Sequence, residues 1–507
     1  MPESRTRWWA LGALAVAMLT IGLDTTVLNV AVPTLATDLS ASTDQLQWFS
    51  TAYTLVLAAA LLPAGMLGDR FGRKRLLVGA LVLFGAASAA CAYATSSGQL
   101  ITARAVLGLG AALMMPLSMA VLPVLFPDRG ERARALTIWV TSTAIGLPLG
   151  PIVGGWLLDT FWWGSVFLIN VPLVVVGVTA VAVLVPESRS ETPRSLDLIG
   201  VALSSAGLLG LTYGFIAAGQ DGCTDACALG SMLGGVAVLA GFVAWQGRVA
   251  HPLIDLGLFR ESAFTWGTLL STLVNFALFG LIFAMPQFFQ AVQGTDALGS
   301  GLRLLPMIGG MVVGTRLAER VAARAGAPAV IAVGSGLLAA ALGVGATTGV
   351  HTSFGVTAVW VTLLGIGLGL AMPTAMSAAV GTLSAERSGA GSALIQALRQ
   401  VGGTIGVAVL GTVLSSGYRA RLDTRDLPAG TAGTVRQSVS AGAATAERLG
   451  LHPLLDSVRG AFVHGMDMML VVSAGLAGLG ALLAIVLLPK RTRHVAPERE
   501  SAHELVS

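Results

Sequence analysis

The sequence predicts an all-α protein that crosses a membrane fourteen times, and three observations support this fold class. Of its 507 residues, 54% are hydrophobic and only 11% are charged, whereas a soluble protein carries roughly a quarter charged residues. Many apolar runs reach the length of about 20 residues that a helix needs to cross a bilayer. Basic residues are concentrated in alternate loops between these runs. Arg, Pro and Asp clusters between long apolar runs also argue against a membrane β-barrel.

The apolar runs give the predicted spans in order along the chain. Their limits are 11–35, 46–67, 76–95, 98–122, 136–158, 165–185, 199–218, 228–246, 264–290, 300–317, 328–349, 354–380, 389–415 and 461–488. An even number of spans places both termini on the same side. The 64 glycines are consistent with helices that pack closely within lipid.

The basic residues predict which side that is. Twenty-one of the 30 lysines and arginines lie near the termini or in the loops on the same side as them. The six short loops on the other side carry none, although the longer loop at about 416–460 has six arginines. By the positive-inside rule, both termini are expected in the cytoplasm of a multi-pass cell-membrane protein. The net charge of +4 therefore reflects membrane topology rather than binding to nucleic acid.

A weak internal repeat predicts the arrangement of the spans. GMLGDRFGRK (65–74) aligns with TRLAERVAAR (315–324) at a constant offset of 250 residues. We expect a six-helix bundle at 1–186, a linker with spans 7 and 8 at 187–263, a second six-helix bundle at 264–489, and a tail at 490–507. Two bundles that rock about a central site are the design of alternating access. The loop at 416–460 is long enough to fold over the outer mouth, but its composition predicts no structure.

Asp24 is the clearest candidate for a functional residue, because it lies inside an apolar span, in GLDTTVLNVAVP (22–33). A carboxylate at the bilayer centre costs roughly 2.5–3.5 kcal/mol on insertion scales. It would hold a proton while enclosed and release it when water reaches it, so it could carry a proton or balance a cationic substrate. The alternative is a carboxylate neutralised by an internal partner, for which Arg104 in span 4 is the candidate. The two interpretations are compatible, and both residues are assigned to proton coupling.

Other classes of function lack their motifs. No Gly-Lys-Ser/Thr motif for nucleotide phosphates is present, and the six histidines show neither metal-ligand pairing nor His-Glu-x-x-His. We therefore expect no enzyme, no cofactor and no metal. The three cysteines are too few for a disulfide framework; Cys223 and Cys227 share a loop and either form one disulfide or remain free thiols.

Five stretches resemble signatures of the major facilitator superfamily, in the order and spans expected there. GMLGDRFGRKR (65–75) is similar to the signature between spans 2 and 3, and RAVLGLGAA (104–112) to that of span 4. The other three resemble signatures of exporters and of fourteen-span drug:proton antiporters: GLPLGPIVGG (146–155), LDTTVLNVAVP (23–33) and FLINVP (167–172). The resemblance implies the major facilitator fold and proton-coupled export of lipophilic drugs or antibiotics by alternating access. A dedicated exporter of one antibiotic or metabolite is the alternative, and GLPLGPIVGG disfavours an importer.

The resemblance also implies roles for two groups of residues. A cytoplasmic gate would be formed by Gly65, Gly68, Asp69, Arg70, Gly72 and Arg73. An antiporter helix that sets the conformational equilibrium would contain Gly146, Pro148, Gly150, Pro151, Gly154 and Gly155. Independently of the family, glycines at every fourth position leave a stripe free of side chains for a close neighbour, and prolines bend the helix.

The chain departs from relatives that export dications, which carry further acids in spans 10 and 13. Gly310 and Gln396 stand at those positions, and span 13 carries Arg399 instead. This departure favours lipophilic monocations or neutral or anionic amphiphiles. Asp467 and His464 form either an outer proton relay or an interfacial polar pair. Further cavity candidates are Asn29, Trp48, Tyr53, Trp139, Phe276, Phe283 and Gln287. The expected partners are a small lipophilic substrate, protons and the lipid bilayer, and we expect the chain to function as a monomer.

Overall fold

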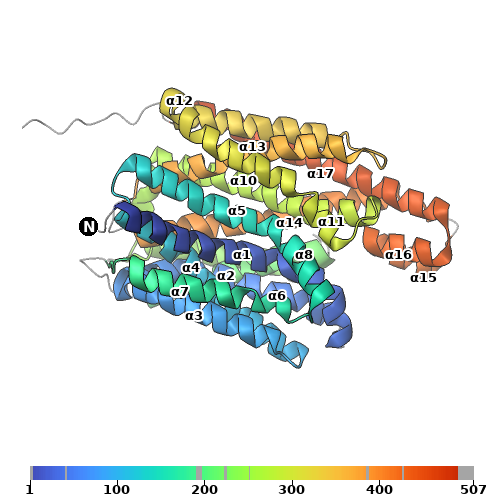
Figure 1. Ribbon diagram of the computed structural model, residues 1–507, viewed down its shortest axis with the longest axis horizontal. Helices are drawn as coiled ribbons and strands as arrows, with labels where there is room; N and C mark the ends of the chain where they lie inside the picture. Colours follow the sequence, from blue (N-terminus) through green and yellow to red (C-terminus); the bar gives the residue numbers. More distant parts are fainter. Residues whose placement is uncertain are drawn as a thin grey trace, which may run out of the picture.

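The computed structural model is built of long helices that run side by side (Figure 1). It describes residues 4–39, 41, 43–189, 197–221, 225–249, 252–383, 388–424 and 427–488. Within these ranges, fourteen helical segments are long and apolar enough to cross a bilayer, which confirms the predicted fold class. The predicted tail at 490–507 lies outside the described residues, as does Cys223, whose pairing with Cys227 is therefore untested.

The first bundle contains α1 to α7. Helix α1 packs along α5 and α7, α2 packs along α4, and α3 packs along α4 and α7. A hydrogen bond joins α1 to α5, because Thr26 Oγ1 donates to the backbone oxygen of Leu147 at 2.6 Å. The bounds are α1 Ser4–Asp38, α2 Thr43–Phe71, α3 Arg73–Ala92, α4 Ser97–Leu125, α5 Arg129–Thr160, α6 Ser165–Leu168 and α7 Asn170–Leu184.

The second bundle contains α10 to α14 and α17. Its longest element, α12, holds two predicted spans joined at Gly326, whose φ of +83° breaks the helical geometry and is a conformation that glycine adopts readily. Helix α12 packs along α13 and α17, and α14 packs along α10 and α17. The bounds are η1 Leu256–Arg260, α10 Ser262–Gln287, the π-helix η2 Phe288–Val292, α11 Ala297–Leu302, α12 Leu305–Gly345, α13 Phe354–Val380, α14 Ser388–Arg421 and α17 His452–Leu487.

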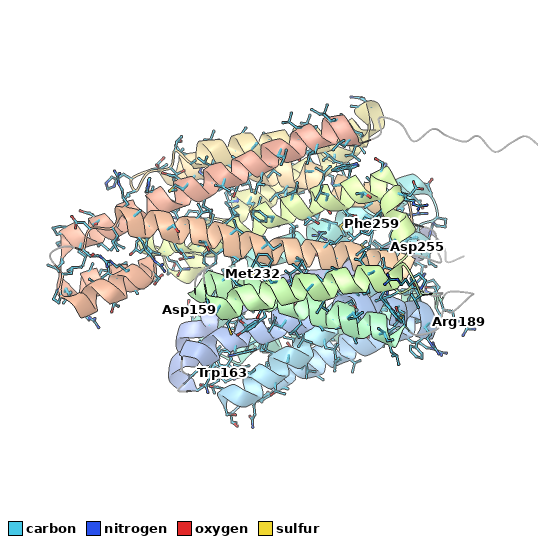
Figure 2. The ribbon with its side chains drawn as sticks, turned by 180° about the vertical axis from the view of Figure 1, so that it is seen from behind. Asp159, Trp163, Arg189, Met232, Asp255 and Phe259 are labelled. Atoms are coloured by element: carbon cyan, nitrogen blue, oxygen red, sulfur yellow. The ribbon has the colours of Figure 1, made fainter. Side chains whose placement is uncertain are left out.

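Spans 7 and 8 form a helical hairpin outside the two bundles. Helix α8 (Leu198–Asp221) packs against α2 of the first bundle and α14 of the second, as well as against α9 (Ala226–Gln246). Ser205 Oγ donates a hydrogen bond to the backbone oxygen of Ala59 on α2 at 2.8 Å. Viewed from behind, α9 with Met232 lies on the outside of the molecule (Figure 2). Helix α8 therefore covers the seam between α2 and α14.

The loop at 416–460 contains helices that its composition did not predict. Helix α14 continues to Arg421, and α15 (Ala429–Gln437) and α16 (Val439–Leu449) follow before α17. Ser438 caps α16, since its hydroxyl oxygen accepts from the backbone N–H of Ala441 at 3.1 Å, and Tyr418 Oη donates to the oxygen of Val435 at 2.7 Å. In Figure 1 these helices lie at the end of the molecule opposite the N-terminus. Helix α16 packs against α17, and α15 packs against α16, so contacts with neighbouring helices rather than a long apolar run stabilise them.

Candidate functional site

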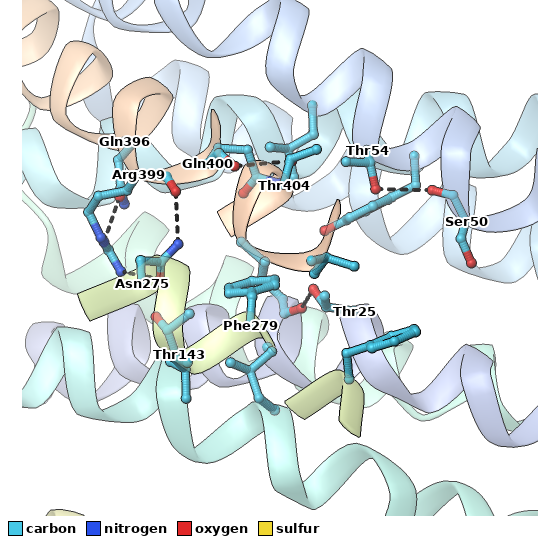
Figure 3. Close-up of a pocket in the computed structure, with 18 of the residues that line it drawn as sticks. Thr25, Ser50, Thr54, Thr143, Asn275, Phe279, Gln396, Arg399, Gln400 and Thr404 are labelled. Atoms are coloured by element: carbon cyan, nitrogen blue, oxygen red, sulfur yellow. Dashed lines mark hydrogen bonds between the residues drawn. The ribbon is translucent and has the colours of Figure 1, made fainter. Parts of the chain in front are cut away.

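A cavity of about 500 Å³ lies between the two bundles. Helices α1, α2, α4 and α5 line it from the first bundle, and α10, α13 and α14 line it from the second. Phe215 and Ile216 of α8 complete the wall. Figure 3 shows Asn275, Gln396 and Arg399 together on one side of the cavity, and Ser50 and Thr54 on the other. Both bundles therefore contribute polar groups to one shared space.

The cavity wall is mostly apolar, and among its described residues Arg399 is the one charged side chain. Aromatic side chains from both bundles line it, including Tyr53 and Trp139 from the first and Phe279 and Phe283 from the second. Neither Asp nor Glu belongs to the described residues of this wall. Apolar pockets with a few placed polar groups are the usual binding sites for small lipophilic molecules.

Asp24 does not line this cavity, because it is fully buried inside the first bundle. Its Oδ2 accepts a hydrogen bond from Arg104 Nη1 at 2.8 Å, and its Oδ1 accepts from Asn170 Nδ2 at 3.1 Å. Asn170 Nδ2 also lies 2.9 Å from Ser88 Oγ, which in turn donates to the backbone oxygen of Phe167. The four helices α1, α3, α4 and α7 thus meet at one buried ion pair.

Tyr53 separates this ion pair from the cavity. The Arg104 guanidinium carbon lies 4.5 Å from the centre of the Tyr53 ring, and Tyr53 also lines the cavity. Arg104 Nε donates to the backbone oxygen of Phe49, one turn earlier on α2, at 2.9 Å. Arg104 is therefore held by Asp24 of α1 and by α2 at the same time. A change in the charge of Asp24 would act directly on the helix that forms part of the cavity wall.

The candidate gate residues lie where α2 approaches α14. Arg73 donates to Asp69 Oδ1 from Nε at 3.0 Å and from Nη2 at 2.7 Å, and Asp69 Oδ2 accepts from the backbone N–H of Ala390 at 3.2 Å. Ala390 lies in the first turn of α14, where backbone N–H groups favour a negative charge. A Cβ atom added at Gly65 would lie 2.5 Å from the backbone oxygen of Gly389. Gly65 is therefore needed for the close approach of the two bundles.

The turn at the end of α2 is fixed by a second carboxylate. Gly72 has a φ of +102°, which favours glycine, and the next helix begins at Arg73. Glu187 accepts hydrogen bonds from the backbone N–H groups of Lys74 at 3.1 Å and Arg75 at 3.3 Å. The residues after α7 are thereby tied to the beginning of α3. Gly68 packs against Leu117 of α4, and the guanidinium of Arg70 lies 5.7 Å from the Phe71 ring.

The glycine stripe of α5 faces α1. A Cβ at Gly146 would lie 2.5 Å from the backbone oxygen of Leu19, and one at Gly154 would lie 2.9 Å from Val27 Cγ2; Gly150 meets Thr26 in the same way. Gly155 faces the second bundle instead, because a Cβ atom added there would lie 3.2 Å from the backbone nitrogen of Leu298. Pro148 and Pro151 lie inside α5 without ending it. This helix therefore contacts its own bundle closely and also reaches the other bundle at the end opposite Asp69.

The chain matches a family model along most of its length. The model describes the major facilitator superfamily and matches residues 14–407. The chain belongs to the major facilitator superfamily.

Curated members of this superfamily resemble the chain over nearly its whole length. The tetracenomycin C resistance and export protein of Streptomyces glaucescens is 32% identical, over 98% of this chain and 94% of its own. The multidrug efflux pump LfrA of Mycolicibacterium smegmatis is 36% identical, over 92% of this chain and 93% of its own. The human organic anion transporter MFSD10 (TETRAN) has a crystal structure that matches with a TM-score of 0.61. It covers 96% of this chain and all of its own, but at 14% identity it shows the fold alone.

This major facilitator protein is a transporter rather than an enzyme, as the sequence predicted. The structure places three of the seven cavity candidates on the wall, Tyr53, Trp139 and Phe283. Trp48, Phe276 and Gln287 are not part of it: the Trp48 side chain is 42% exposed, Phe276 packs against the buried core, and Gln287 donates to the backbone oxygen of Phe283. The Asn29 side chain lies outside the described part of the chain. Asp467 and His464 lie on α17, away from the cavity.

Two features of the transporter were not found by sequence reasoning. Asn170 binds Asp24, yet the sequence singles it out only as one letter of FLINVP and not as a site residue. A polar residue inside an apolar span was the signal that could have found it. Phe215 and Ile216 on α8 line the cavity, although nothing in their apolar surroundings distinguishes them in the sequence.

Proposed function

We propose that this transporter is a proton-coupled antiporter that exports lipophilic drugs or antibiotics by alternating access, with Asp24 as the coupling carboxylate. The observation that carries the proposal is the buried pair of Asp24 and Arg104, which contacts the cavity wall through Tyr53. The curated relatives named above are a drug-resistance exporter and a multidrug pump, which supports export. The chain forms the whole cavity by itself, so we infer that it works as a monomer.

In the proposed cycle, the proton binds at Asp24 Oδ2, the oxygen that now accepts from Arg104. Protonation removes the negative charge of the pair, so Arg104 loses its counter-charge and keeps its contacts to Phe49 and Tyr53 on α2 and to the Phe167 ring. Helix α2 then gains freedom to move relative to α1. Release of the proton restores the ion pair and the present arrangement. Because the pair and the cavity share Tyr53, occupation of the cavity and protonation of Asp24 are coupled.

The same helix carries the change to the gate. Tyr53 and Asp69 both belong to α2 and, at about 1.5 Å per residue, lie about 24 Å apart along its axis. When the bundles separate at this end, Asp69 loses Ala390 while Arg73, on its own bundle, remains. Contacts that exist in one conformation only give a ligand or proton the differential interaction that shifts an equilibrium. With the orientation predicted by the positive-inside rule, this end faces the cytoplasm.

The proton gradient supplies enough free energy for export. Each proton that enters gains about 2.3 kcal/mol per 100 mV of membrane potential. A further gain of about 1.36 kcal/mol comes from each unit of pH difference. Since every 1.4 kcal/mol or so is a tenfold concentration ratio, one proton sustains a substrate gradient of roughly tenfold to several hundredfold.

The test is made with the full chain in proteoliposomes under an imposed pH gradient. Ethidium is one probe, a cation, and anilinonaphthalene sulfonate is the other, an anion whose sulfonate carries no proton across the bilayer. Probe movement and internal pH are recorded together for the wild type, for Asp24→Asn and for the control Asp159→Asn, at the exposed end of α5. We expect the wild type and the control to exchange at least one probe for protons. We expect Asp24→Asn to move neither a probe nor protons.

Two results would count against the proposal. Coupled exchange by Asp24→Asn at the wild-type rate would show that Asp24 is not the coupling group. No movement of either probe by the wild type would contradict export of lipophilic molecules in general. A dedicated exporter of one compound would move one probe or its relatives only, so the range of probes moved distinguishes it from a multidrug pump.

A further inference from the structure

Arg399, like Arg104, is an arginine inside a predicted span, and it lies in the wall of the cavity. Its side chain is 9% exposed, and it comes from α14 of the second bundle. Nη1 donates to Gln396 Oε1 at 2.8 Å and lies 3.3 Å from Met376 Sδ, and Nη2 lies 3.5 Å from Asn275 Oδ1. Its Nε has no hydrogen-bond partner in the part of the chain that the structure describes. The protein thus supplies neutral acceptors to Arg399 and leaves one of its donors unused.

The contrast with Arg104 shows what is missing. Arg104 is also buried, at 1% exposed, but Asp24 Oδ2 lies 2.8 Å from its Nη1. Among the residues that the structure describes, no carboxylate lies within ion-pair distance of Arg399. A buried charge without a counter-charge is costly to keep. An apolar residue at this position would fill the helix contact without the cost of a buried charge. We therefore infer that the counter-charge of Arg399 comes from a bound molecule.

The neighbours of Arg399 also favour an anion. Gln396 Nε2 is buried and has no hydrogen-bond partner among the described residues, so a second donor is available beside the unused Nε. Asn275 Nδ2 donates to the backbone oxygen of Arg399 at 2.8 Å, which fixes the helix at this point. Figure 3 shows the three side chains together on one side of the cavity. A guanidinium and an amide N–H side by side match the two oxygens of a carboxylate or sulfonate.

The rest of the cavity fits an apolar body. Across from Arg399, the first bundle supplies the rings of Tyr53 and Trp139, and α8 supplies Phe215. With no acid in the described wall, a cation entering the cavity meets one positive charge and nothing to balance its own.

We propose that the cavity binds small lipophilic molecules that carry a negatively charged group, with that group on Arg399 and Gln396 and the apolar body against the aromatic wall of the first bundle. The inference rests on the proposed export function and narrows its substrate class to lipophilic acids. Such a ligand touches both bundles at once. It therefore holds them together around the cavity and neutralises Arg399 at the same step.

The test measures binding rather than transport, so it is independent of proton coupling. Three probes share a pyrenebutyl body and differ in the charge of the head group: pyrenebutyrate, its neutral methyl ester, and pyrenebutyl trimethylammonium. Each is titrated by calorimetry into the full chain in nanodiscs, with empty nanodiscs as the blank. We expect the wild type to bind the acid roughly tenfold or more tightly than the ester, and the cation most weakly.

Variants separate recognition of charge from folding. We expect Arg399→Gln to bind acid and ester equally while ester affinity stays as in the wild type, which also shows that the cavity is intact. Arg399→Lys should keep part of the preference, and Gln396→Glu should abolish it, because the new carboxylate would pair with Arg399 within the protein. The matched control is Arg303→Gln, since Arg303 lies in a predicted span against Phe289 and Phe354 and outside the cavity wall; its preference should not change.

The proposal is overturned by any of three results: no preference of the wild type for the acid, failure of the wild type to bind the acid, or an unchanged preference in Arg399→Gln. Failure of the proposed function is recognised separately. A protein that binds the acid through Arg399 but exchanges no probe for protons would retain this site and lose the antiport mechanism.

Discussion

Asp69 of α2 accepts a hydrogen bond from the backbone N–H of Ala390 in α14 at 3.2 Å, and this contact joins the two bundles. The same carboxylate forms an ion pair with Arg73 at 2.7 Å within the first bundle. One side chain therefore serves both the local turn and the boundary between bundles. Its position at the first turn of α14 makes the contact sensitive to charge.

We expect Asp69→Asn to open this end of the molecule more often. Loss of a charge at a helix N-terminus costs about 0.3–1 kcal/mol, which shifts a two-state equilibrium roughly two- to fivefold. The measurement uses Ala393→Cys, a position now fully buried at this contact, in a chain whose Cys223 and Cys227 are replaced by serine. Its rate of labelling by a water-soluble maleimide should rise by that factor.

The control for this experiment is Asp159→Asn, at the exposed end of α5 away from the contact. It should leave labelling of Ala393→Cys unchanged. Equal labelling rates with and without the Asp69→Asn substitution would show that the carboxylate does not hold the bundles together.

The contact of α5 with α1 predicts different effects for two glycine substitutions. In Gly146→Ala, the new methyl group would lie 2.5 Å from the backbone oxygen of Leu19, so the helices must separate. Forcing a group into a packed interface costs about 1–3 kcal/mol, which should lower the midpoint of thermal unfolding in detergent. Gly12→Ala, on α1 with no atom within 4 Å of the new Cβ, is the matched control and should unfold as the wild type does. Equal midpoints for the two variants would contradict the close approach.

The buried pair predicts that two substitutions together are better tolerated than one. Arg104→Gln leaves Asp24 without its charged partner, at a cost of up to about 3–5 kcal/mol. We expect the double variant Asp24→Asn and Arg104→Gln to recover most of the lost thermal stability, because neither charge remains. It should nevertheless fail to exchange any probe for protons. A double variant less stable than Arg104→Gln would show that the pair is not the dominant interaction at this site.

Tyr53 is expected to act through its ring and not through its hydroxyl group. Among the described residues, its Oη has no hydrogen-bond partner, whereas the ring lies 4.5 Å from the Arg104 guanidinium carbon. Tyr53→Phe should therefore retain coupled transport. Tyr53→Leu removes a cation–π contact of about 0.5–2 kcal/mol and should lower the rate of coupled exchange in proteoliposomes by roughly two- to thirtyfold. If the phenylalanine variant loses as much activity as the leucine variant, the hydroxyl group has a role that this conformation does not show.

Hydropathy and charge were sufficient to predict the spans, because apolar length is what a bilayer selects. The pairing of Asp24 with Arg104 was also within reach, since each is a charge inside an apolar span and has few available partners. The signature at 65–75 indicated where the bundles meet, although its link to Ala390 needed the structure.

What remained out of reach were the faces that the helices turn toward one another. A span that is apolar all round gives no amphipathic stripe from which its buried side can be read. Phe215 on α8 and Phe276 on α10 look alike in the sequence, yet the first lines the cavity and the second packs against the buried core. The helices α15 and α16 were missed for the opposite reason, since they are short, polar and stabilised by neighbours.

The position of α8 determines which way a molecule dissolved in the lipid reaches the interior. Between α2 and α14, an acyl chain or a partitioned compound meets a transmembrane helix in place of an opening. Entry from the bilayer is left to the opposite seam, where α5 faces α11, α12 and α13. The two inserted spans thus make the two boundaries between the bundles different. The boundary of α2 and α14 is covered by α8, and the boundary at α5 is not covered by an inserted helix.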